Sequence, residues 1–290
     1  MLMFSMIVSG SLIFGSVVAN DIDPSAITAI RFLFAFFLLF GIMGLQAKKK
    51  IKAFDSPSRY VSLAILISLY FVLMFEGLKT ASAVSMSAIM TLTPFIAVIL
   101  EYILERRKIK GMTFVALFIG ALGSLWIIFD ANFLKIISFN IGYGETLFFI
   151  GCVCQALYTV LVPKFNSGES DLEQTTKIMI SSALIIILFD IEAITSTSWY
   201  SLGPMIWLTI LYLSIFATAG AFFIIRYSRN TISGTNVMAY YYLVPMWVLI
   251  FEVLVKGNIP KFEIWLGCFA IILTFTMILS KDVKLFSKRF

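Results

Sequence analysis

The chain has 290 residues, of which 60% are hydrophobic and 13% charged, with a mean hydropathy of +0.99 and a formal net charge of +6. A soluble domain carries about a quarter charged residues and roughly half apolar ones. A soluble fold of this length could not remove so much apolar surface from water, because most of its residues touch the outside. The composition therefore excludes a soluble globular protein and predicts an integral membrane protein.

Ten apolar segments have the length of membrane spans, since a span needs about 20 mostly apolar residues. They cover residues 2–19, 25–46, 59–78, 81–104, 110–129, 144–162, 174–190, 202–225, 232–255 and 262–280. We interpret the first as a retained helix and not a signal peptide, because no basic residue precedes Arg31. The connecting segments are too short for a soluble domain.

Basic residues gather in alternate connecting segments, and such asymmetry orients membrane helices. With the N-terminus in the cytoplasm, seventeen of the 22 Lys and Arg residues fall in cytoplasmic segments, four fall in outer loops, and Arg31 lies inside a span. We expect both termini on the cytoplasmic side of a bacterial cytoplasmic (inner) membrane, with the lipid bilayer as the surrounding partner. This distribution accounts for the basic pI, so we predict no nucleic-acid partner.

A stretch of the fourth span returns in the ninth. TASAVSMSAIMTLTPFIAVILE (80–101) aligns without a gap with TISGTNVMAYYYLVPMWVLIFE (231–252), so that Pro94 matches Pro245. Each copy is the fourth of five spans, and five is an odd number, so the second half begins on the opposite side of the membrane. Inverted repeats with interrupted helices are typical of secondary transporters, whose substrate lies near the middle of the bilayer. We expect each proline to break or bend its helix.

Several segments resemble the EamA-type repeats of the drug/metabolite transporter superfamily. They are PSAITAIRFLFA (24–35), GLKTASAVSMSAIMTLTPFIAVILEYILERRKIKG (77–111), GALGSLW (120–126), LYTVLVPKF (157–165) and SRNTISGTNVMAYYYLVPMWVLIFEVLVKGNIP (228–260). The chain departs from the family pattern where Glu105 lacks a preceding glycine, where Lys256 replaces a glutamate, and where Phe14-Gly15 replaces Trp-Gly.

The resemblance covers nearly the whole chain and implies an all-α polytopic membrane protein, with ten transmembrane helices as two inverted five-helix repeats around a central cavity. The first repeat would span 1–129, a connecting loop 130–143, the second repeat 144–281 and a basic cytoplasmic tail 282–290. It also implies alternating access and a small-molecule substrate.

The predicted function is secondary transport of an amino acid or related metabolite, in the direction of export. Uptake of a host metabolite such as S-adenosylmethionine is the alternative. Proton coupling is a further hypothesis, the oligomeric state is open, and we expect no cofactor. A membrane-embedded enzyme is disfavoured, because the chain has no histidine and its candidate aspartates, Asp130 and Asp190, lie at span ends.

Arg31 lies about two turns into the second span, where an arginine costs roughly 2.5–3.5 kcal/mol. One interpretation is a cation that faces the cavity and pairs with a substrate carboxylate or a protein acid. The alternative is snorkelling, because about 7 residues at ~1.5 Å each leave Arg31 ~10 Å from the outer end of its helix.

The other predicted cavity residues are polar, aromatic or helix-breaking residues within the spans: Thr91, Pro94, Gln155, Tyr158, Asn236, Tyr240, Tyr241, Pro245 and Trp247. Phenol hydroxyls near the centre of a span need partners, which favours a cavity; packing against neighbouring helices is the alternative.

Four glutamates lie within about a turn of a span end: Glu76, Glu101, Glu145 and Glu252. Solvation at the interface is their plain interpretation, and a gate or proton-transfer role is the other. The three cysteines lie in apolar runs without any histidine, so we predict no metal site. Two stripes of small residues, Ala83-Ser87-Thr91 and Ala116-Gly120-Ser124, predict helix packing.

Overall fold

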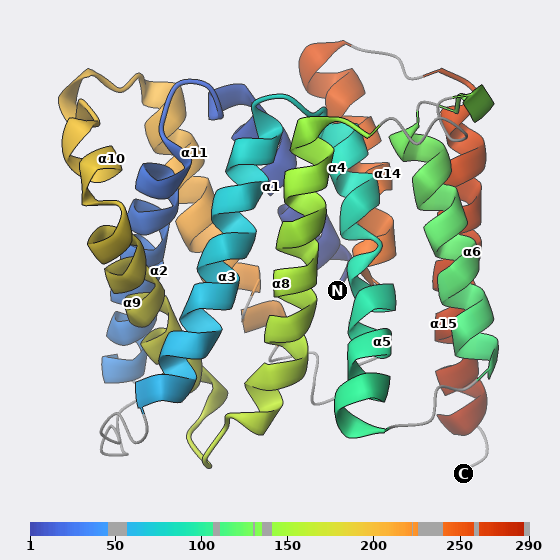
Figure 1. Cartoon of the computed structure of the whole chain (residues 1–290), viewed down its shortest axis with the longest axis horizontal. Coiled ribbons are helices and arrows are strands. Elements are labelled where there is room, and N and C mark those ends of the chain that lie inside the picture. The colour runs from blue at the N-terminus through green and yellow to red at the C-terminus, as the bar shows by residue number, and fades with distance from the viewer. Residues whose placement is uncertain are drawn as a thin grey trace.

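The structure is a computed structural model that describes residues 1–45, 57–106, 111–129, 131–134, 141–221, 223–225, 240–257 and 261–286. Over these residues the chain is helical and contains no strand (Figure 1). The all-α prediction is therefore confirmed for the described part of the chain.

The α-helices follow one another along the whole chain. They are α1 (Leu2–Val18), α2 (Pro24–Leu45), α3 (Pro57–Leu78), α4 (Ala83–Met90), α5 (Thr93–Glu105), α6 (Gly111–Ile128), α8 (Tyr143–Lys164), α9 (Asp171–Phe189), α10 (Ile191–Ser196), α11 (Pro204–Ser214), α14 (Val244–Phe251) and α15 (Ile264–Phe286). Four short segments have other helical forms: the 3₁₀ segments η1 (Trp199–Ser201) and η3 (Tyr240–Leu243), and the π-helical segments η2 (Ile215–Gly220) and η4 (Glu252–Lys256).

Six described helical segments are long and apolar enough to cross a membrane: 24–45, 57–78, 83–104, 143–164, 171–189 and 204–225. Four shorter apolar helices cover 2–18, 114–128, 240–254 and 264–278. The predicted ninth span begins outside the described residues.

Polar residues fix several helix starts. The side chain of Asp23 accepts a hydrogen bond from the backbone N–H of Ser25 at 2.7 Å, just before α2. Ser170 accepts from the N–H of Glu173 at 3.2 Å and so caps α9. Such caps satisfy backbone donors that have no partner inside the helix.

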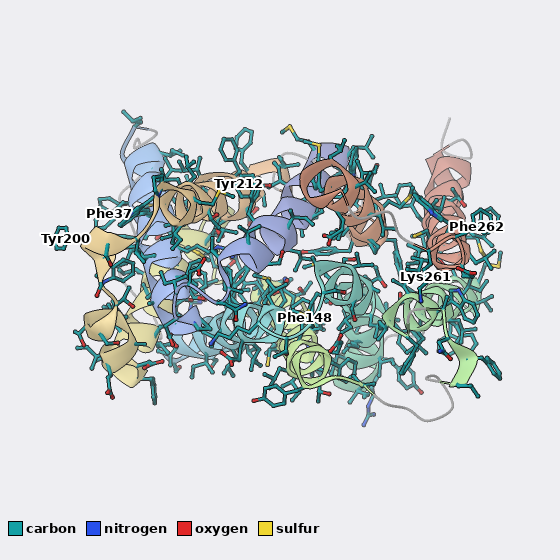
Figure 2. All side chains as sticks on the ribbon, turned by 90° about the horizontal axis from the view of Figure 1, so that it is seen from above. Phe37, Phe148, Tyr200, Tyr212, Lys261 and Phe262 are labelled. Atoms are coloured by element: carbon teal, nitrogen blue, oxygen red, sulfur yellow. The ribbon has the colours of Figure 1, made fainter. Side chains whose placement is uncertain are left out.

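Helices that are far apart in the sequence pack against one another. α3 lies against α8 and α9, α2 against α9 and α11, and α1 against α11 and α14. α6 and α15 lie side by side at the opposite end of the molecule from α2, α9 and α11 (Figure 1). The interior between the helices is apolar, and Phe148 is fully buried there, whereas Phe37, Tyr200 and Phe262 are exposed at the periphery (Figure 2).

The backbone departs from the α-helix just before each of the two repeated prolines. Between α4 and α5, the N–H of Thr91 bonds the carbonyl of Ala88 at 3.1 Å and that of Leu92 bonds Ile89 at 2.9 Å. These are i to i−3 bonds of the 3₁₀ type. The 3₁₀ segment η3 likewise precedes α14, and Pro245, like Pro94, occupies the first turn of the next helix.

The same two stretches also end alike. The residue after α5 is Arg106, which has φ 51° and ψ 27°, and the residue after η4 is Gly257, which has φ 69° and ψ 11°. These two left-handed residues are separated by the same 151 residues as Pro94 and Pro245. A left-handed residue after the last helical one is a common way to end a helix, and glycine suits it best.

Two pairs of small residues let helices approach closely. A Cβ atom on Gly267 would lie 2.7 Å from the carbonyl oxygen of Gly123, and one on Gly123 would lie 2.8 Å from that of Gly267, so α6 and α15 meet backbone to backbone. The predicted small-residue stripes of the fourth and fifth spans touch where the hydroxyls of Thr91 and Ser124 are in direct contact, whereas Gly120 faces Tyr242 and Thr274. Small residues at membrane helix contacts permit this approach.

Candidate functional site

Arg31 is the most deeply buried charged residue of the described chain, with 1% of its surface exposed. Its Nε donates a hydrogen bond to Thr218 Oγ1 at 2.7 Å, and its Cζ lies 3.8 Å from the centre of the Phe71 ring. The guanidinium is therefore held between α2, α3 and η2, and it does not extend to the surface as a snorkelling side chain would.

The π-helical segment η2 presents the hydroxyl that Arg31 bonds. Thr218 Oγ1 also donates a hydrogen bond to the carbonyl of Leu213, five residues earlier, at 2.9 Å. Because that bond uses the hydroxyl proton, the oxygen is left to accept from Arg31. Short π-helical bulges occur frequently at functional sites, and this one lies directly beside a buried cation.

No described carboxylate forms an ion pair with Arg31, and its Nη1 is buried without a hydrogen-bond partner among the described residues. Residues 2–18, 24–45 and 204–225 contain no Asp or Glu, and Glu76 of α3 pairs with Lys79 at 2.7 Å. The ionisable groups that act electrostatically on Arg31 are the phenols of Tyr70 and Tyr212. A buried charge without a counter-charge is costly, so this position calls for an anion.

Tyr70 connects Arg31 to two of the predicted cavity residues. It lies within electrostatic range of Arg31, Cys152 and Tyr241. Tyr241 packs edge-on against Phe4, with ring centroids 5.4 Å apart, and the Gln155 amide lies beside its phenol. Gln155 Oε1 is itself buried without a hydrogen-bond partner within the described residues. The structure thus brings Arg31, Gln155 and Tyr241 into one region.

Sequence reasoning missed Tyr70, Tyr212 and Thr218. Tyr70 and Tyr212 lie well inside their helices, so the criterion used for Tyr241, a phenol deep in a span, would have found both had it been applied to every span. Thr218 gives no such signal, because its role depends on the π-helical backbone around it.

The structure places the remaining predicted residues elsewhere. Thr91 contacts Ser124, and the Tyr240 ring lies edge-on to Phe275 at 5.2 Å. Trp247 donates its Nε1 proton to Ser5 Oγ at 3.1 Å and so joins α14 to α1. Pro94 and Pro245 mark the helix breaks, Tyr158 is half-buried on α8, and Asn236 lies outside the described residues.

The four predicted gate glutamates are spread over several helix ends. Glu76 pairs with Lys79 at 2.7 Å on a partly exposed surface. Glu145 is half-buried in the first turn of α8. Glu101 in α5 and Glu252 at the start of η4 are also half-buried. They do not form one cluster, and no described group of three or more His, Cys, Asp or Glu side chains could hold a metal ion.

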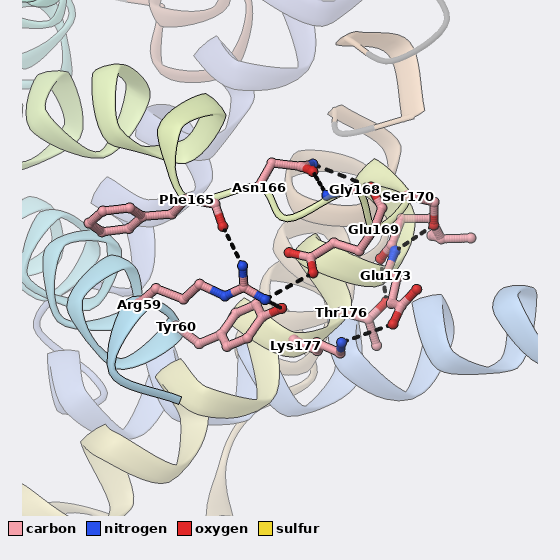
Figure 3. Close-up of polar contacts among 11 residues, drawn as sticks. Arg59, Tyr60, Phe165, Asn166, Gly168, Glu169, Ser170, Glu173, Thr176 and Lys177 are labelled. Carbon is pink, nitrogen blue, oxygen red and sulfur yellow. Dashed lines mark hydrogen bonds and ion pairs between the residues drawn. The ribbon is translucent and has the colours of Figure 1, made fainter. Parts of the chain in front are cut away.

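A second buried polar cluster lies where α3 and α9 begin (Figure 3). Arg59 bonds Glu169 Oε2 at 3.2 Å, the carbonyl of Phe165 at 3.1 Å and the Tyr60 hydroxyl at 3.0 Å. Lys177 bonds Glu173 Oε1 at 2.8 Å. Both cations here have an acid partner, whereas Arg31 has none within the described ranges, and the cluster joins α3 to the segment between α8 and α9.

Comparison with known proteins extends these observations. The model of the EamA-like transporter family matches residues 1–129 and 142–280. The chain belongs to the EamA-like transporter family. It is 26% identical over 253 residues to the uncharacterized transporter YyaM of Bacillus subtilis (strain 168), which covers 87% of this chain and 83% of that one. It is 25% identical over 269 residues to an uncharacterized transporter of Archaeoglobus fulgidus, covering 90% of each.

A crystal structure of a protein with 16% sequence identity superposes on this EamA-family chain with a TM-score of 0.73, over 98% of this chain and 97% of the other. At that identity the likeness concerns the fold alone. The family and its apolar helices identify an integral membrane transporter with a small-molecule substrate, and they point away from an enzyme.

Proposed function

We propose that this EamA-family protein is a secondary transporter that moves a small organic metabolite across the bacterial cytoplasmic membrane. In this proposal, two inverted halves of five spans each give alternating access to a central site beside Arg31, and both termini lie in the cytoplasm. The observation that carries the proposal is the exchange of helix contacts between the halves.

Contacts between helices recur when each span of one half is replaced by the corresponding span of the other half. If the spans are numbered from one to ten, the contact of α3 with α8 joins spans three and six, and that of α11 with α1 joins spans eight and one. The contact of α3 with α9 is matched by that of α11 with α2. Spans two and seven (α2, α9) and spans five and ten (α6, α15) pack on their own counterparts. A two-fold relation between the halves would give this pattern, and five spans in each half favour an axis in the membrane plane.

The exchange also holds for single residues. A Cβ on Gly151 of α8 would lie 3.3 Å from the carbonyl oxygen of Tyr70 of α3. In the other half, a Cβ on Gly10 of α1 would lie 2.8 Å from the Cζ of Tyr212 of α11. A glycine of the first span of each half thus faces a tyrosine of the third span of the opposite half, and both tyrosines lie near Arg31.

Alternating access requires that contacts at one end of the molecule break while those at the other form. The Arg59 cluster joins α3 of the first half to the α8–α9 segment of the second, at the end that the charge distribution predicts to be cytoplasmic. Arg31 lies ~10 Å from the opposite end of its helix. The cluster would keep the cytoplasmic end closed, and its opening would expose the central site to that side.

The proposed cargo is an amino acid or related metabolite, and the proposed direction is export; uptake of a host metabolite such as S-adenosylmethionine is the alternative. Counterflow in liposomes tests the proposal, with purified protein and a panel of labelled amino acids, S-adenosylmethionine and nucleotide sugars. Exchange of any of these supports transport. Silence across the panel, with folded protein, would contradict the proposed cargo.

Orientation is tested separately with single cysteines placed in a variant that lacks the natural three. Ser58→Cys lies at the proposed cytoplasmic end and Ser196→Cys at the other. An impermeant maleimide should label Ser196→Cys in intact cells, and Ser58→Cys only after permeabilisation. Labelling of both from one side would contradict the topology.

A further inference from the structure

We propose that Arg31 binds the carboxylate of a cargo that carries net negative charge, with no cationic group in the cargo to compensate it. This inference rests on the proposed transport function, because it identifies the region around Arg31 with the cargo site. Within the proposed class of amino acids and related metabolites, it favours an anionic relative over a zwitterionic amino acid or S-adenosylmethionine.

Arg31 differs from the other buried cations in its partners. Arg59 and Lys177 each have a carboxylate partner, at 3.2 Å and 2.8 Å. Arg31 is buried more completely and has no ion-pair partner in the part of the chain that the structure describes. A guanidinium remains charged in proteins. In this proposal the cargo supplies the negative charge that the described residues do not place beside Arg31.

The donors of the Arg31 guanidinium have the geometry that a carboxylate needs. A guanidinium has five N–H donors in one plane, and its fork matches both oxygens of a carboxylate. Thr218 occupies the Nε donor and the Phe71 ring covers one face of the group. Nη1, by contrast, is buried and has no partner in the described structure. A carboxylate that approaches the Nη edge in the plane of the group would satisfy it.

The described surroundings of Arg31 offer no acid for a cationic group on the cargo. An ammonium or sulfonium group on the cargo would need an acid beside it, yet the side chains linked to Arg31 are uncharged: Tyr70, Tyr212, Cys152, Tyr241 and Gln155. Spans one, two and eight contain no acid in their sequence, and the acid of span three, Glu76, pairs with Lys79 at 2.7 Å. The site therefore favours a carboxylate with an apolar or aromatic body over a zwitterionic amino acid or an adenosyl sulfonium cation.

The test uses thermal unfolding of purified protein in detergent with matched probes. Phenylacetate and 4-methylpentanoate are the anions, their amides are the neutral controls, and phenylalanine and phenethylamine add a zwitterion and a cation. We expect the two anions to raise the Tm, with the other probes at least tenfold less potent. We expect Arg31→Gln to weaken anion binding by roughly 100-fold, since loss of one partner of a buried charge pair typically has an effect of this size.

Arg31→Met distinguishes a ligand site from a structural one. If Arg31 is unpaired in the empty protein, methionine should keep or raise the Tm without ligand and abolish the response to the anions. The matched control is Arg59→Met, which should lower the Tm, because it leaves Glu169 buried without its cation. A fall in Tm for Arg31→Met as large as that for Arg59→Met would overturn the inference.

The outcomes separate this inference from the transport proposal. Counterflow of a neutral or cationic compound that Arg31→Met leaves intact would overturn the inference and keep transport. Equal stabilisation by the amides, or no stabilisation by either anion, would also overturn it. A response to the anions that depends on Arg31, without counterflow of either anion or of any compound in the transport panel, would support the site and contradict transport.

Discussion

Gly267→Ala should loosen the pairing of α6 with α15. The added Cβ would lie 2.7 Å from the carbonyl oxygen of Gly123 and 2.7 Å from Ile127 Cγ1. The carbonyl belongs to a helix backbone and cannot rotate away, so the two helices must move apart by roughly half an ångström or more to restore ordinary contact. Overpacking of this kind costs about 1–3 kcal/mol.

The matched control is Gly41→Ala on α2, where the new Cβ would have nothing within 4 Å. Both changes gain the same helix propensity, about 1 kcal/mol in favour of alanine. The two variants should therefore differ by about 1–3 kcal/mol in unfolding free energy. Gly41→Ala should be the more stable, and wild type should lie below it.

The assay is thermal unfolding in detergent followed by tryptophan fluorescence, where each kcal/mol corresponds to about 2–4 °C in Tm. Gly123→Ala should behave like Gly267→Ala. The double variant should cost less than the two single effects added together, because helices already separated by one Cβ accommodate the other. Equal Tm values for Gly267→Ala and Gly41→Ala would refute the reasoning.

Three further changes test other parts of the structure by the same unfolding assay. Arg106→Gly should stabilise the protein by about 1 kcal/mol, because a left-handed conformation costs an L-residue about that much and costs glycine little; no gain would mean that α5 ends in another way. Arg59→Gln should cost roughly 3 kcal/mol, since Glu169 would remain buried without its cation, and adding Glu169→Gln should recover part of that loss. Trp247→Phe should cost about 1 kcal/mol through the lost hydrogen bond to Ser5, and an unchanged Tm would show that this bond does not join α14 to α1.

The positions of the helices follow closely from the sequence. Apolar length and polar breaks predicted a span at 144–162 where α8 covers Tyr143–Lys164, and one at 25–46 where α2 covers Pro24–Leu45. These boundaries depend on local chemistry, such as the Asp23 cap and the proline that follows it. The repeated stretch also located both backbone irregularities, because a proline affects the turn before it wherever it occurs.

The partners of the helices could not be predicted in the same way. A helical period assigns a residue to a face, but it does not identify the helix that meets that face. The Arg59 cluster shows the difference, because its members come from three segments that meet only in the fold. Thr218 shows it too, since the π-helical segment that turns its hydroxyl toward Arg31 has no sequence signal of its own.

α2 and α9 differ in the surroundings of their buried cations, Arg31 and Lys177. α2 and α9 pack against each other, each begins at a side-chain cap, Asp23 or Ser170, and each carries a cation about two turns later. Lys177 of α9 has Glu173 one turn before it and pairs with it at 2.8 Å. Arg31 of α2 has Ile27 at the corresponding place. The cation without an acid four residues before it is thus the one proposed to bind the cargo.

Ile27→Glu should give Arg31 of α2 an acid partner one turn before it, as Glu173 is for Lys177 of α9. A glutamate four residues before a basic residue on a helix lies on the same face and can pair with it, as Glu173 does with Lys177. The new carboxylate should occupy the guanidinium and abolish the Tm shift caused by phenylacetate. Ile27→Gln is the control, because it has similar size but no charge and should weaken the shift much less. Full retention of the phenylacetate response in Ile27→Glu would show that Arg31 does not bind the carboxylate of the cargo.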